Sequence, residues 1–457
     1  MTSTDGSVTM PPPSGAKSGG RLSFGVIFLV LFLDLVGFGI LFPLYPEMMT
    51  HYLNNEPGLL APLVDLIVRW FPNASPEQRT TLFGGILAGA YSAVQFISAP
   101  FWGRMSDRIG RRPIMRLSLL ASVAAGILWV FAASFNLLLL SRLVAAFFGG
   151  AAIAATAAVA DVTDSPQARA RGMALVGMAF GLGFILGPVI GGLSGFVLPK
   201  IEGGAAWHGL GLNPFSNVAL VALALAVVNL IWAWRSFAET LPPERRGQIT
   251  NQRSANPLVM FLGSSDQVRL NVTAFAHALL FAGMETTLGF LVWERLAYGR
   301  VHIGFLFAAM GLVSAAMQGL VFRRLAPRVG ARPLALVGFV LLAGGFAVLA
   351  LVDHAPSSTL VWAGVVLLAC GTGLVFPALT TLISLSADAQ SQGSILGAFR
   401  SASSLGRAIG PLLAAVTYFS IAPAAPYWTG AALMIVPLLL LRGVRVGPAS
   451  TAAPAHG

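Results

Sequence analysis

Twelve long apolar runs, separated by short polar segments, constrain the fold of this 457-residue chain more than any other feature. A helix needs about 20 apolar residues to cross the hydrocarbon core of a bilayer. Only 10% of the residues are charged, whereas a soluble domain carries about 25%. We therefore predict an all-α membrane protein with twelve transmembrane helices in contact with lipid. The expected spans are residues 22–49, 80–102, 114–135, 137–161, 170–198, 215–237, 270–293, 302–323, 333–352, 358–384, 392–420 and 426–442.

The net charge of +11 does not indicate a nucleic-acid partner, because the basic residues fall in short clusters between the apolar runs and form no single patch. Membrane proteins keep such clusters on the cytoplasmic side. With a cytoplasmic N-terminus, 20 of the 28 Lys and Arg residues lie in cytoplasmic segments and 5 in external ones. We therefore expect a multi-pass protein of the inner (plasma) membrane with both termini in the cytoplasm.

Several classes of protein are excluded by what the sequence lacks. A single cysteine, Cys370, permits neither a disulfide framework nor a cysteine-based metal site within one chain. No phosphate-binding loop is present, so ATP hydrolysis is not the expected energy source. The first apolar run is too long for the hydrophobic core of a signal peptide. We expect a monomer without metal, cofactor or enzymatic activity, whose partners are lipid, protons and a small molecule.

The chain divides into two related halves. The segment after the second span, 103–113, agrees with the segment after the eighth, 323–333, at five of eleven positions. Gly187-Pro188 in the fifth span is repeated by Gly410-Pro411 in the eleventh. Parallel six-helix repeats are one architecture of secondary transporters. The expected parts are a disordered tail 1–21, a six-helix half 22–237, a linker 238–269, a second half 270–442 and a tail 443–457, with a possible interfacial helix at 59–71 in the first external loop.

Two carboxylates are expected deep in the membrane. Asp34 lies roughly 12 residues into the first span, about 18 Å from its start at 1.5 Å per residue. Glu285 lies at a comparable depth in the seventh span, two turns after His277. An ionised carboxylate at such depth is costly, so it should be paired, protonated or exposed to water. Asp34 is interpreted as a proton carrier or as a structural partner of Arg142, and Glu285 as a second proton site or a binder of a cationic solute.

The motifs resemble those of the major facilitator superfamily along nearly the whole chain. The segment Gly103-x-x-x-Asp107-Arg108-x-Gly110-Arg111-Arg112 is similar to the signature between spans two and three of that family. Arg142 stands at the second signature position, in span four. The span-one pattern Leu33-Asp34-x-x-Gly37-x-Gly39-Ile40-x-x-Pro43-x-x-Pro46 is similar to that of the tetracycline-pump branch. Span five carries Gly183-x-x-x-Gly187-Pro188-x-x-Gly191-Gly192, which resembles the signature associated with drug:proton antiporters.

The resemblance implies roles for these residues. Asp107 would latch the cytoplasmic ends of the two halves together, with Arg400 as its expected partner, and Asp161 would join this latch or cap its helix. Arg142 would influence proton movement at the acid of span one. The span-five glycines would form a bendable, leak-tight seam. The expected cavity-lining residues, for which ordinary interhelical contact is the alternative, are Tyr91, Gln95, His277, Gln318, Phe376 and Phe399.

These features predict a secondary transporter that exports a small amphipathic molecule in exchange for protons. Ser314 stands where tetracycline pumps carry a histidine, and span nine has no carboxylate before Asp353, which argues against tetracycline itself as the substrate. One alternative is a proton-coupled importer of a sugar or organic acid, against which the span-five signature argues. Another is a membrane receptor or scaffold that transports nothing, against which the buried acids argue.

Overall fold

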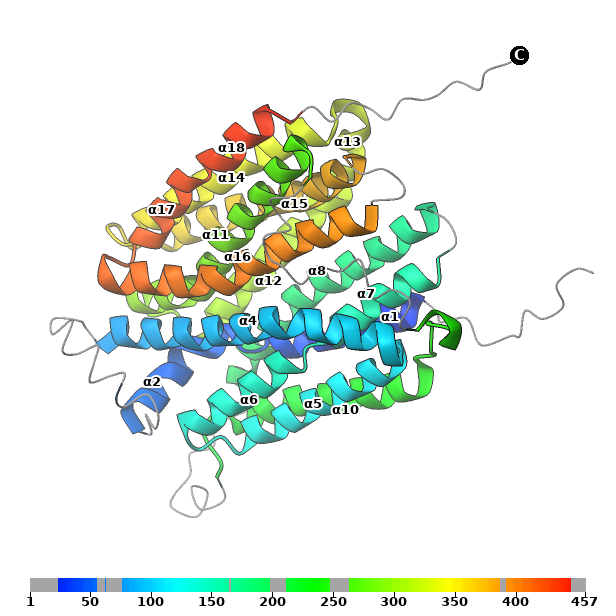
Figure 1. Cartoon of the computed structure of the whole chain (residues 1–457). Helices are drawn as coiled ribbons and strands as arrows, with labels where there is room; N and C mark the ends of the chain where they lie inside the picture. Colours follow the sequence, from blue (N-terminus) through cyan, green and yellow to red (C-terminus); the bar gives the residue numbers. More distant parts are fainter. Residues whose placement is uncertain are drawn as a thin grey trace, which may run out of the picture.

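The computed structural model describes residues 24–55, 62, 76–163, 166–197, 211–246, 263–386 and 392–444. Within these ranges the chain is helical and contains no strand. Figure 1 shows two bundles side by side, one built from the helices up to α10 (the N half) and one from α11 onward (the C half). The tail 1–21, the segment 59–71 apart from Pro62, residues 247–262 of the linker and the tail from 445 lie outside the described residues.

The N half follows the predicted spans closely. Its elements are α1 (Phe24–Gly39), the 3-10 turn η1 (Phe42–Leu44), α2 (Tyr45–Asn55), α4 (Pro76–Ile109), α5 (Arg111–Val130), α6 (Phe135–Phe147), α7 (Ala151–Asp161), α8 (Pro166–Val197) and α10 (Ser216–Ser236). A 3-10 turn, η3 (Pro243–Arg245), follows in the linker.

The C half has the same order of long helices. Its elements are α11 (Ser265–Leu296), α12 (Arg300–Ala316), the π-helical segment η5 (Met317–Phe322), α13 (Arg323–Val329), α14 (Ala331–Leu351), α15 (Ser358–Leu385), α16 (Gln392–Ser420), α17 (Ala425–Leu433) and α18 (Ile435–Arg442). The helix α11 begins five residues before the expected start of its span, because Ser264 and Gln267 form a reciprocal capping box there.

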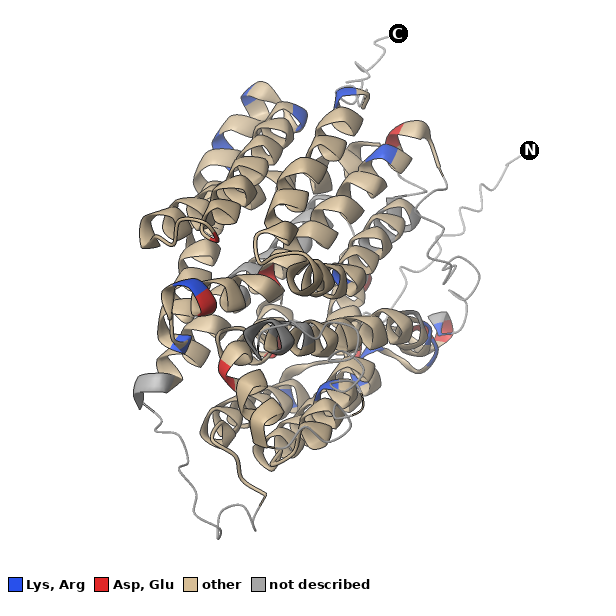
Figure 2. Ribbon diagram, turned by 90° about the vertical axis from the view of Figure 1, so that its left-hand side faces the viewer, with Lys and Arg blue, Asp and Glu red and all other residues tan. Residues whose placement is uncertain are grey.

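Nine helical segments of the described chain are long and apolar enough to cross a membrane. They coincide with nine of the predicted spans, and α4, α8 and α16 cover the remaining three ranges. Figure 2 shows charged residues to be sparse along the helices. The predicted all-α, multi-pass fold is confirmed, and twelve spans are consistent with it.

The related segments 103–113 and 323–333 form the same turn in both halves. Gly110 separates α4 from α5 at φ 112°, and Gly330 separates α13 from α14 at φ 84°. Such angles are strained for a residue with a Cβ but open to glycine. We call the end of the molecule that holds these two turns the motif end, and the opposite end, where α4 begins and α16 finishes, the far end.

Helix pairs related by the internal repeat pack through small residues. In the N half, a Cβ on Gly183 would lie 2.5 Å from the Cβ of Leu35, and one on Gly187 would lie 2.7 Å from the Cα of Gly39. In the C half, Gly406 and Gly410 press against α11 in the same way, with added Cβ atoms 2.5 Å and 2.2 Å from the carbonyl oxygens of Phe275 and Leu279. Backbones that approach so closely hold helices together in lipid without any hydrophobic driving force.

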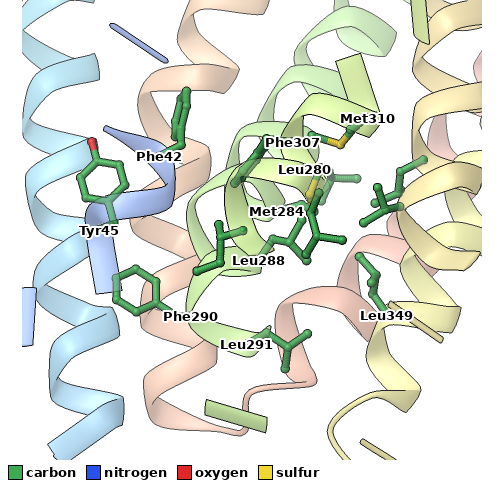
Figure 3. Close-up of a cluster of buried hydrophobic side chains, with 14 of the residues drawn as sticks. Phe42, Tyr45, Leu280, Met284, Leu288, Phe290, Leu291, Phe307, Met310 and Leu349 are labelled. Carbon is green, nitrogen blue, oxygen red and sulfur yellow. The ribbon is translucent and has the colours of Figure 1, made fainter. Parts of the chain in front are cut away.

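The two halves meet near the far end. The helix α8 packs on α12, where a Cβ on Gly192 would lie 2.8 Å from the Cα of Gly304. The helix α4 packs on α16, where a Cβ on Gly89 would lie 3.3 Å from the Cβ of Leu412. The ring of Phe42 stacks on that of Phe307 with centroids 5.6 Å apart. Figure 3 shows these rings in an apolar cluster to which both halves contribute.

Hydrophobic packing differs at the motif end. A second buried cluster there includes Ile27, Trp102, Met115 and Phe237, and all of its members in the described chain belong to the N half. The apolar core therefore joins the halves toward the far end, while the motif end of the N half has a core of its own.

Candidate functional site

Asp34 lies on α1 at about 15 Å from the first described residue of that helix, at 1.5 Å per residue. Its side chain is partly buried. One turn later on the same face, Phe38 packs against Tyr91 of α4 with ring centroids 5.3 Å apart. Within the described chain, Asp34 makes no hydrogen bond or ion pair with another residue, although its charge interacts with the Tyr91 hydroxyl. A partly accessible carboxyl without a fixed cation can take up and release a proton.

Arg142 lies on α6 and is 8% exposed. It donates a hydrogen bond from Nη2 to Ser141 Oγ at 2.8 Å, and its guanidinium lies 4.8 Å from the centre of the Trp129 ring. Its charge interacts with the hydroxyl groups of Tyr45, Tyr52 and Tyr91. No carboxylate of the described residues pairs with it. Tyr91 therefore interacts with the charges of both Asp34 and Arg142, and no ion pair between these two is found among the described residues, although it was considered as an alternative role for Asp34.

Glu285 forms an ion pair across two helices of the C half. Its Oε2 atom lies 3.2 Å from Nη2 of Arg407 on α16, and the carboxylate is 6% exposed whereas the arginine side chain is 40% exposed. The sequence placed Arg407 inside a span but did not single it out. An acid buried in lipid is costly unless a cation from a neighbouring helix pairs with it. This cost is the signal that could have identified Arg407 as the partner of Glu285.

His277 lies two turns before Glu285 on α11 and is 9% exposed. Its ring stacks on Phe281 at 5.7 Å and meets the edge of Phe339 at 6.0 Å. Its Nε2 atom has no hydrogen-bond partner in the described part of the chain, and its ring interacts electrostatically with Arg407. His277 is therefore packed among aromatic rings near the Glu285–Arg407 pair.

The motif-end segment forms a charged network around Arg111, which is 2% exposed. Its Nη1 atom lies 2.5 Å from Oδ1 of Asp107, and its Nε atom lies 2.8 Å from Oδ2 of Asp161. Thr240, after α10, donates a hydrogen bond to the same oxygen of Asp161 at 3.0 Å. The structure thus brings Asp161 to the motif, and the cation that joins the two acids is Arg111.

Glu239 closes this network at the start of α5. Its carboxylate accepts hydrogen bonds from the backbone N–H groups of Arg111 at 2.9 Å and Arg112 at 3.2 Å. These are orphan donors at the positive end of a helix, where a carboxylate is favourable. The segment beyond α10 is therefore tied to the α4–α5 turn. Glu239 was missed because its partners are backbone atoms more than 120 residues away.

The other motif residues differ in how deeply they are buried. Arg108 is exposed, and Gly103 is buried with its Cα facing Ile153 of α7. Arg400 lies on the described helix α16, but its side chain is outside the described part, so its expected contact with Asp107 stays a prediction.

The span-five glycines lie where α8 contacts both α1 and α12. Gly183 and Gly187 face α1, a Cβ on Gly191 would lie 2.1 Å from the carbonyl oxygen of Ile40, and Gly192 faces α12. Pro188 is buried inside α8 against Gly39. This helix therefore connects the Asp34 helix with the seam between the halves.

The remaining cavity candidates do not form one cluster. Gln95 is exposed and reaches toward Gly149, and Phe399 is buried in the apolar core. Gln318 lies in the π-helical segment and donates a hydrogen bond to Ser314 Oγ at 3.4 Å, whereas Phe376 is 51% exposed. A cavity of about 410 Å³ lies elsewhere, on the seam between the halves, and is lined by Ile185, Tyr298, His302, Phe305, Ala308, Ala309, Leu312 and Trp362.

The described residues contain no group of three or more His, Cys, Asp or Glu side chains able to hold a metal ion. The charged groups of the candidate site are Asp34 and Arg142 around Tyr91 in the N half, and Glu285 and Arg407 in the C half.

Comparison with known proteins gives consistent matches along the chain. The model of the Major Facilitator Superfamily matches residues 27–411. Major facilitator superfamily domain-containing protein 10 of Bos taurus is 33% identical, over 96% of both chains. The class B tetracycline resistance protein of Escherichia coli is 28% identical, over 89% of this chain and 90% of that protein. The crystal structure of the human organic anion transporter MFSD10 (TETRAN) has a TM-score of 0.73 and 31% identity, covering 93% of this chain and all of that one.

Proposed function

Because the chain belongs to the Major Facilitator Superfamily and is a transporter rather than an enzyme, we propose that it exports a small amphipathic molecule in exchange for protons. A central site between the halves would alternate between the two sides of the membrane. We further propose that the protein works as a monomer in the inner (plasma) membrane, with the motif end and both termini in the cytoplasm.

One observation carries the proton coupling. Asp34 lies within a membrane-spanning helix and has no cationic partner among the described residues. A permanent charge at that depth is costly unless it is paired or hydrated. A carboxyl that is protonated in one state and ionised in another avoids a lasting cost, and such a change biases the equilibrium between two conformations.

The surroundings of Asp34 support a link between protonation and movement. Its helix packs on α8 through Gly183 and Gly187, and α8 packs on α12 of the other half through Gly192. A change of charge at Asp34 therefore acts one helix away from the seam between the halves. The charge of Arg142 on α6 interacts with the same tyrosine as the charge of Asp34.

The names of the similar proteins support the choice of substrate class. Tetracycline resistance proteins are among the curated relatives, and a structural relative is described as an organic anion transporter. Both kinds of solute are organic molecules with polar and apolar parts. An efflux panel of dyes, tetracyclines, quinolones and organic anions in a pump-deficient host would identify the class transported.

Purified protein in liposomes with an imposed pH gradient tests the carrier directly. Asp34→Asn should abolish uphill transport of the identified solute while exchange down its own gradient persists. Glu244→Gln, which removes an exposed acid of the linker, is the matched control and should transport normally. Unchanged uphill transport by Asp34→Asn would show that another group carries the proton.

The Glu285–Arg407 pair favours a second candidate, transport of an organic acid together with a proton. An anion that takes the place of Glu285 at Arg407 would favour protonation of the displaced carboxyl, so that solute and proton bind to the same state. In a solute:proton exchanger, by contrast, the solute and the proton compete for binding. The sign of the pH-gradient dependence in vesicles decides between them, since only cotransport accumulates solute on the alkaline side.

A further inference from the structure

Three arginines lie at the motif end of the N half, on the helices α5 and α10. These two helices pack side by side at the edge of the bundle, where a Cβ on Gly126 would lie 3.3 Å from the Cα of Leu223 (Figure 1). Arg112 and Arg116 are half-buried in the first turns of α5, and Arg235 is exposed in the last turn of α10. The start of one helix and the end of the other therefore bring three cations to the same level of the molecule.

The apolar surface beside these arginines indicates where the lipid headgroups lie. Each helix presents an exposed apolar stripe that runs up to the arginines, namely Leu220, Val228 and Ile231 on α10, and Leu117, Leu120 and Ile127 on α5. Arg235 comes four residues after Ile231, so it continues the stripe of α10 on the same face. A helix face that is apolar and exposed over several turns contacts acyl chains, and the basic residues at its end reach the headgroups. The three arginines therefore stand at headgroup level.

Two tryptophans support this placement. Trp232 and Trp234 are exposed near the end of α10. Tryptophan is enriched at the interface between membrane and water, because its ring is apolar and its N–H group is polar. The guanidinium of Arg116 lies 4.2 Å from the centre of the Trp234 ring, and its Nη2 atom donates a hydrogen bond to the carbonyl oxygen of Trp234 at 3.0 Å. These contacts hold an arginine and a tryptophan of different helices together at the interface.

The charges of the three arginines are not balanced by acids of the described chain. Arg112 and Arg116 are four residues apart on α5 and their like charges interact, an arrangement that destabilises a helix. None of the three arginines forms an ion pair among the described residues. Glu239, the acid at the start of α5, is engaged by the backbone N–H groups of Arg111 and Arg112 and by an ion pair with Arg246. An anion from outside the chain would therefore relieve the repulsion.

We propose that Arg112, Arg116 and Arg235 bind the headgroup of an anionic phospholipid such as phosphatidylglycerol. The planar fork of an arginine donates two parallel hydrogen bonds to phosphate oxygens, and the exposed leucines beside it contact the acyl chains. A zwitterionic phospholipid carries the same phosphate, but the three arginines repel its cationic amine. The site therefore selects a lipid by the net charge of its headgroup.

The internal repeat shows that this group belongs to the N half alone. At the offset of 220 that relates 103–113 to 323–333, Arg112 corresponds to Arg332, whereas Arg116 corresponds to Leu336. Arg332 donates a hydrogen bond from Nη2 to the carbonyl oxygen of Arg442 at the end of α18, a helix without tryptophan. The C half therefore lacks both the second arginine and its aromatic partner, and its own arginines serve as controls.

Tryptophan fluorescence of the full-length protein in liposomes tests the proposal without a gradient or a solute. Phosphatidylglycerol or phosphatidylcholine with brominated acyl chains, each diluted into unbrominated phosphatidylcholine, quenches the tryptophans that it contacts. The difference between the wild type and Trp234→Phe isolates the signal of Trp234. At equal mole fraction, brominated phosphatidylglycerol should quench Trp234 more strongly than brominated phosphatidylcholine. Added salt should reduce this excess quenching, because the charges are exposed.

Substitutions separate a binding site from a general attraction. Arg116→Gln and Arg235→Gln should each lower the relative affinity for phosphatidylglycerol by about 5-fold, the usual contribution of one basic residue near an anionic surface. Arg116→Lys should keep most of that affinity because it keeps the charge, whereas a residue that only packs on Trp234 would lose it with either substitution. Arg324→Gln and Arg328→Gln, which remove exposed arginines at the motif end of the C half, are the matched controls and should bind like the wild type. Arg235 is exposed, so Arg235→Gln keeps the proposal testable even if Arg116→Gln does not fold.

The proposal is overturned if the two brominated lipids quench Trp234 of the wild type equally, or if Arg235→Gln retains the full excess quenching. An equal loss with Arg324→Gln or Arg328→Gln would also overturn it, since the net charge of the protein rather than a site would then attract the lipid. The measurement reports lipid binding alone. Its failure leaves proton-driven transport standing, and failure of the Asp34→Asn test leaves the lipid site standing.

Discussion

Arg111 shows how a single residue can hold a charged network at the edge of a membrane. It is almost completely buried, and it contacts Asp107 on the other side of the Gly110 turn and Asp161 at the end of α7. Removing one partner of a buried ion pair leaves an uncompensated charge, which costs more than the pair itself contributes. The arginine is therefore expected to matter for folding of the motif end before any role in gating.

Arg111→Gln should lower the free energy of unfolding by about 3–5 kcal/mol, the cost of breaking a buried pair. The check is thermal unfolding of the detergent-purified protein. Arg108→Gln, an exposed neighbour of the same charge, should change the midpoint little. Equal effects of the two substitutions would mean that the network contributes no more than a surface charge.

The same residues show what could be predicted from the sequence. Asp34 and Glu285 stand out because acids are costly in apolar spans. Their surroundings were less predictable: Arg407 pairs with Glu285 across 122 residues, and Asp107 pairs with the arginine four positions along. A contact between distant helices depends on their relative rotation, which local periodicity does not fix. The Asp107–Arg111 pair was missed because 103–113 was interpreted as a loop, whereas Asp107 lies in the last turn of α4 and Arg111 begins α5, across the Gly110 turn.

At the scale of helices, glycines determine how closely the halves approach. At the contact of α8 with α12, a Cβ on Gly304 would lie 2.7 Å from the carbonyl oxygen of Pro188 and 2.8 Å from the Cα of Gly192. These neighbours are backbone atoms, which cannot rotate away as a side chain does. Any larger residue therefore has to push the two helices apart.

Gly304→Ala should weaken closure of the far end by about 1–3 kcal/mol, the usual cost of overpacking, and shift the population toward an open far end. The measurement is labelling of Phe42→Cys, a position 9% exposed in the closed seam, by a membrane-impermeant maleimide in a Cys370→Ser background. Gly344→Ala, where an added Cβ has no atom within 4 Å, should label as slowly as the parent. A slow rate with Gly304→Ala would mean that the seam accommodates the methyl group.

The helix ends were less predictable than the spans. The π-helical segment Met317–Phe322 and the break between α6 and α7 at Gly149-Gly150 leave no clear mark in an apolar sequence. Hydropathy indicates only that a segment lies in lipid. It does not locate a helix end or a break, because the residues on both sides of it are equally apolar. Capping side chains and glycines at positive φ locate helix ends, as at Ser264 and Gly330.

At the scale of the whole molecule, two similar halves are joined unequally. The internal repeat places α4 against α16 and α8 against α12, so the two seams are related by the same pseudo-symmetry. The N half joins the shared apolar core only toward the far end, and it has a separate core at the motif end. If the halves alternate between two states, as we propose, the far-end seams have to separate at one point of the transport cycle.

A disulfide across one seam tests whether this separation is required. An ideal Cβ on Gly89 lies 3.3 Å from the Cβ of Leu412, close to the 3.5–4.5 Å spacing that a disulfide needs. Gly89→Cys with Leu412→Cys, in a Cys370→Ser background, should therefore cross-link α4 to α16. Transport in proteoliposomes should cease on oxidation and return on reduction, because the bond holds the far end closed.

The N half offers a matched control for this experiment. An ideal Cβ on Gly126 lies 3.4 Å from the Cβ of Leu223, and both residues belong to helices that move as one body if the halves are rigid. Gly126→Cys with Leu223→Cys should cross-link equally well and leave transport intact. Loss of transport in both pairs would point to flexing within the N half, and full transport with Gly89 bonded to Leu412 would exclude separation of the α4–α16 seam from the transport cycle.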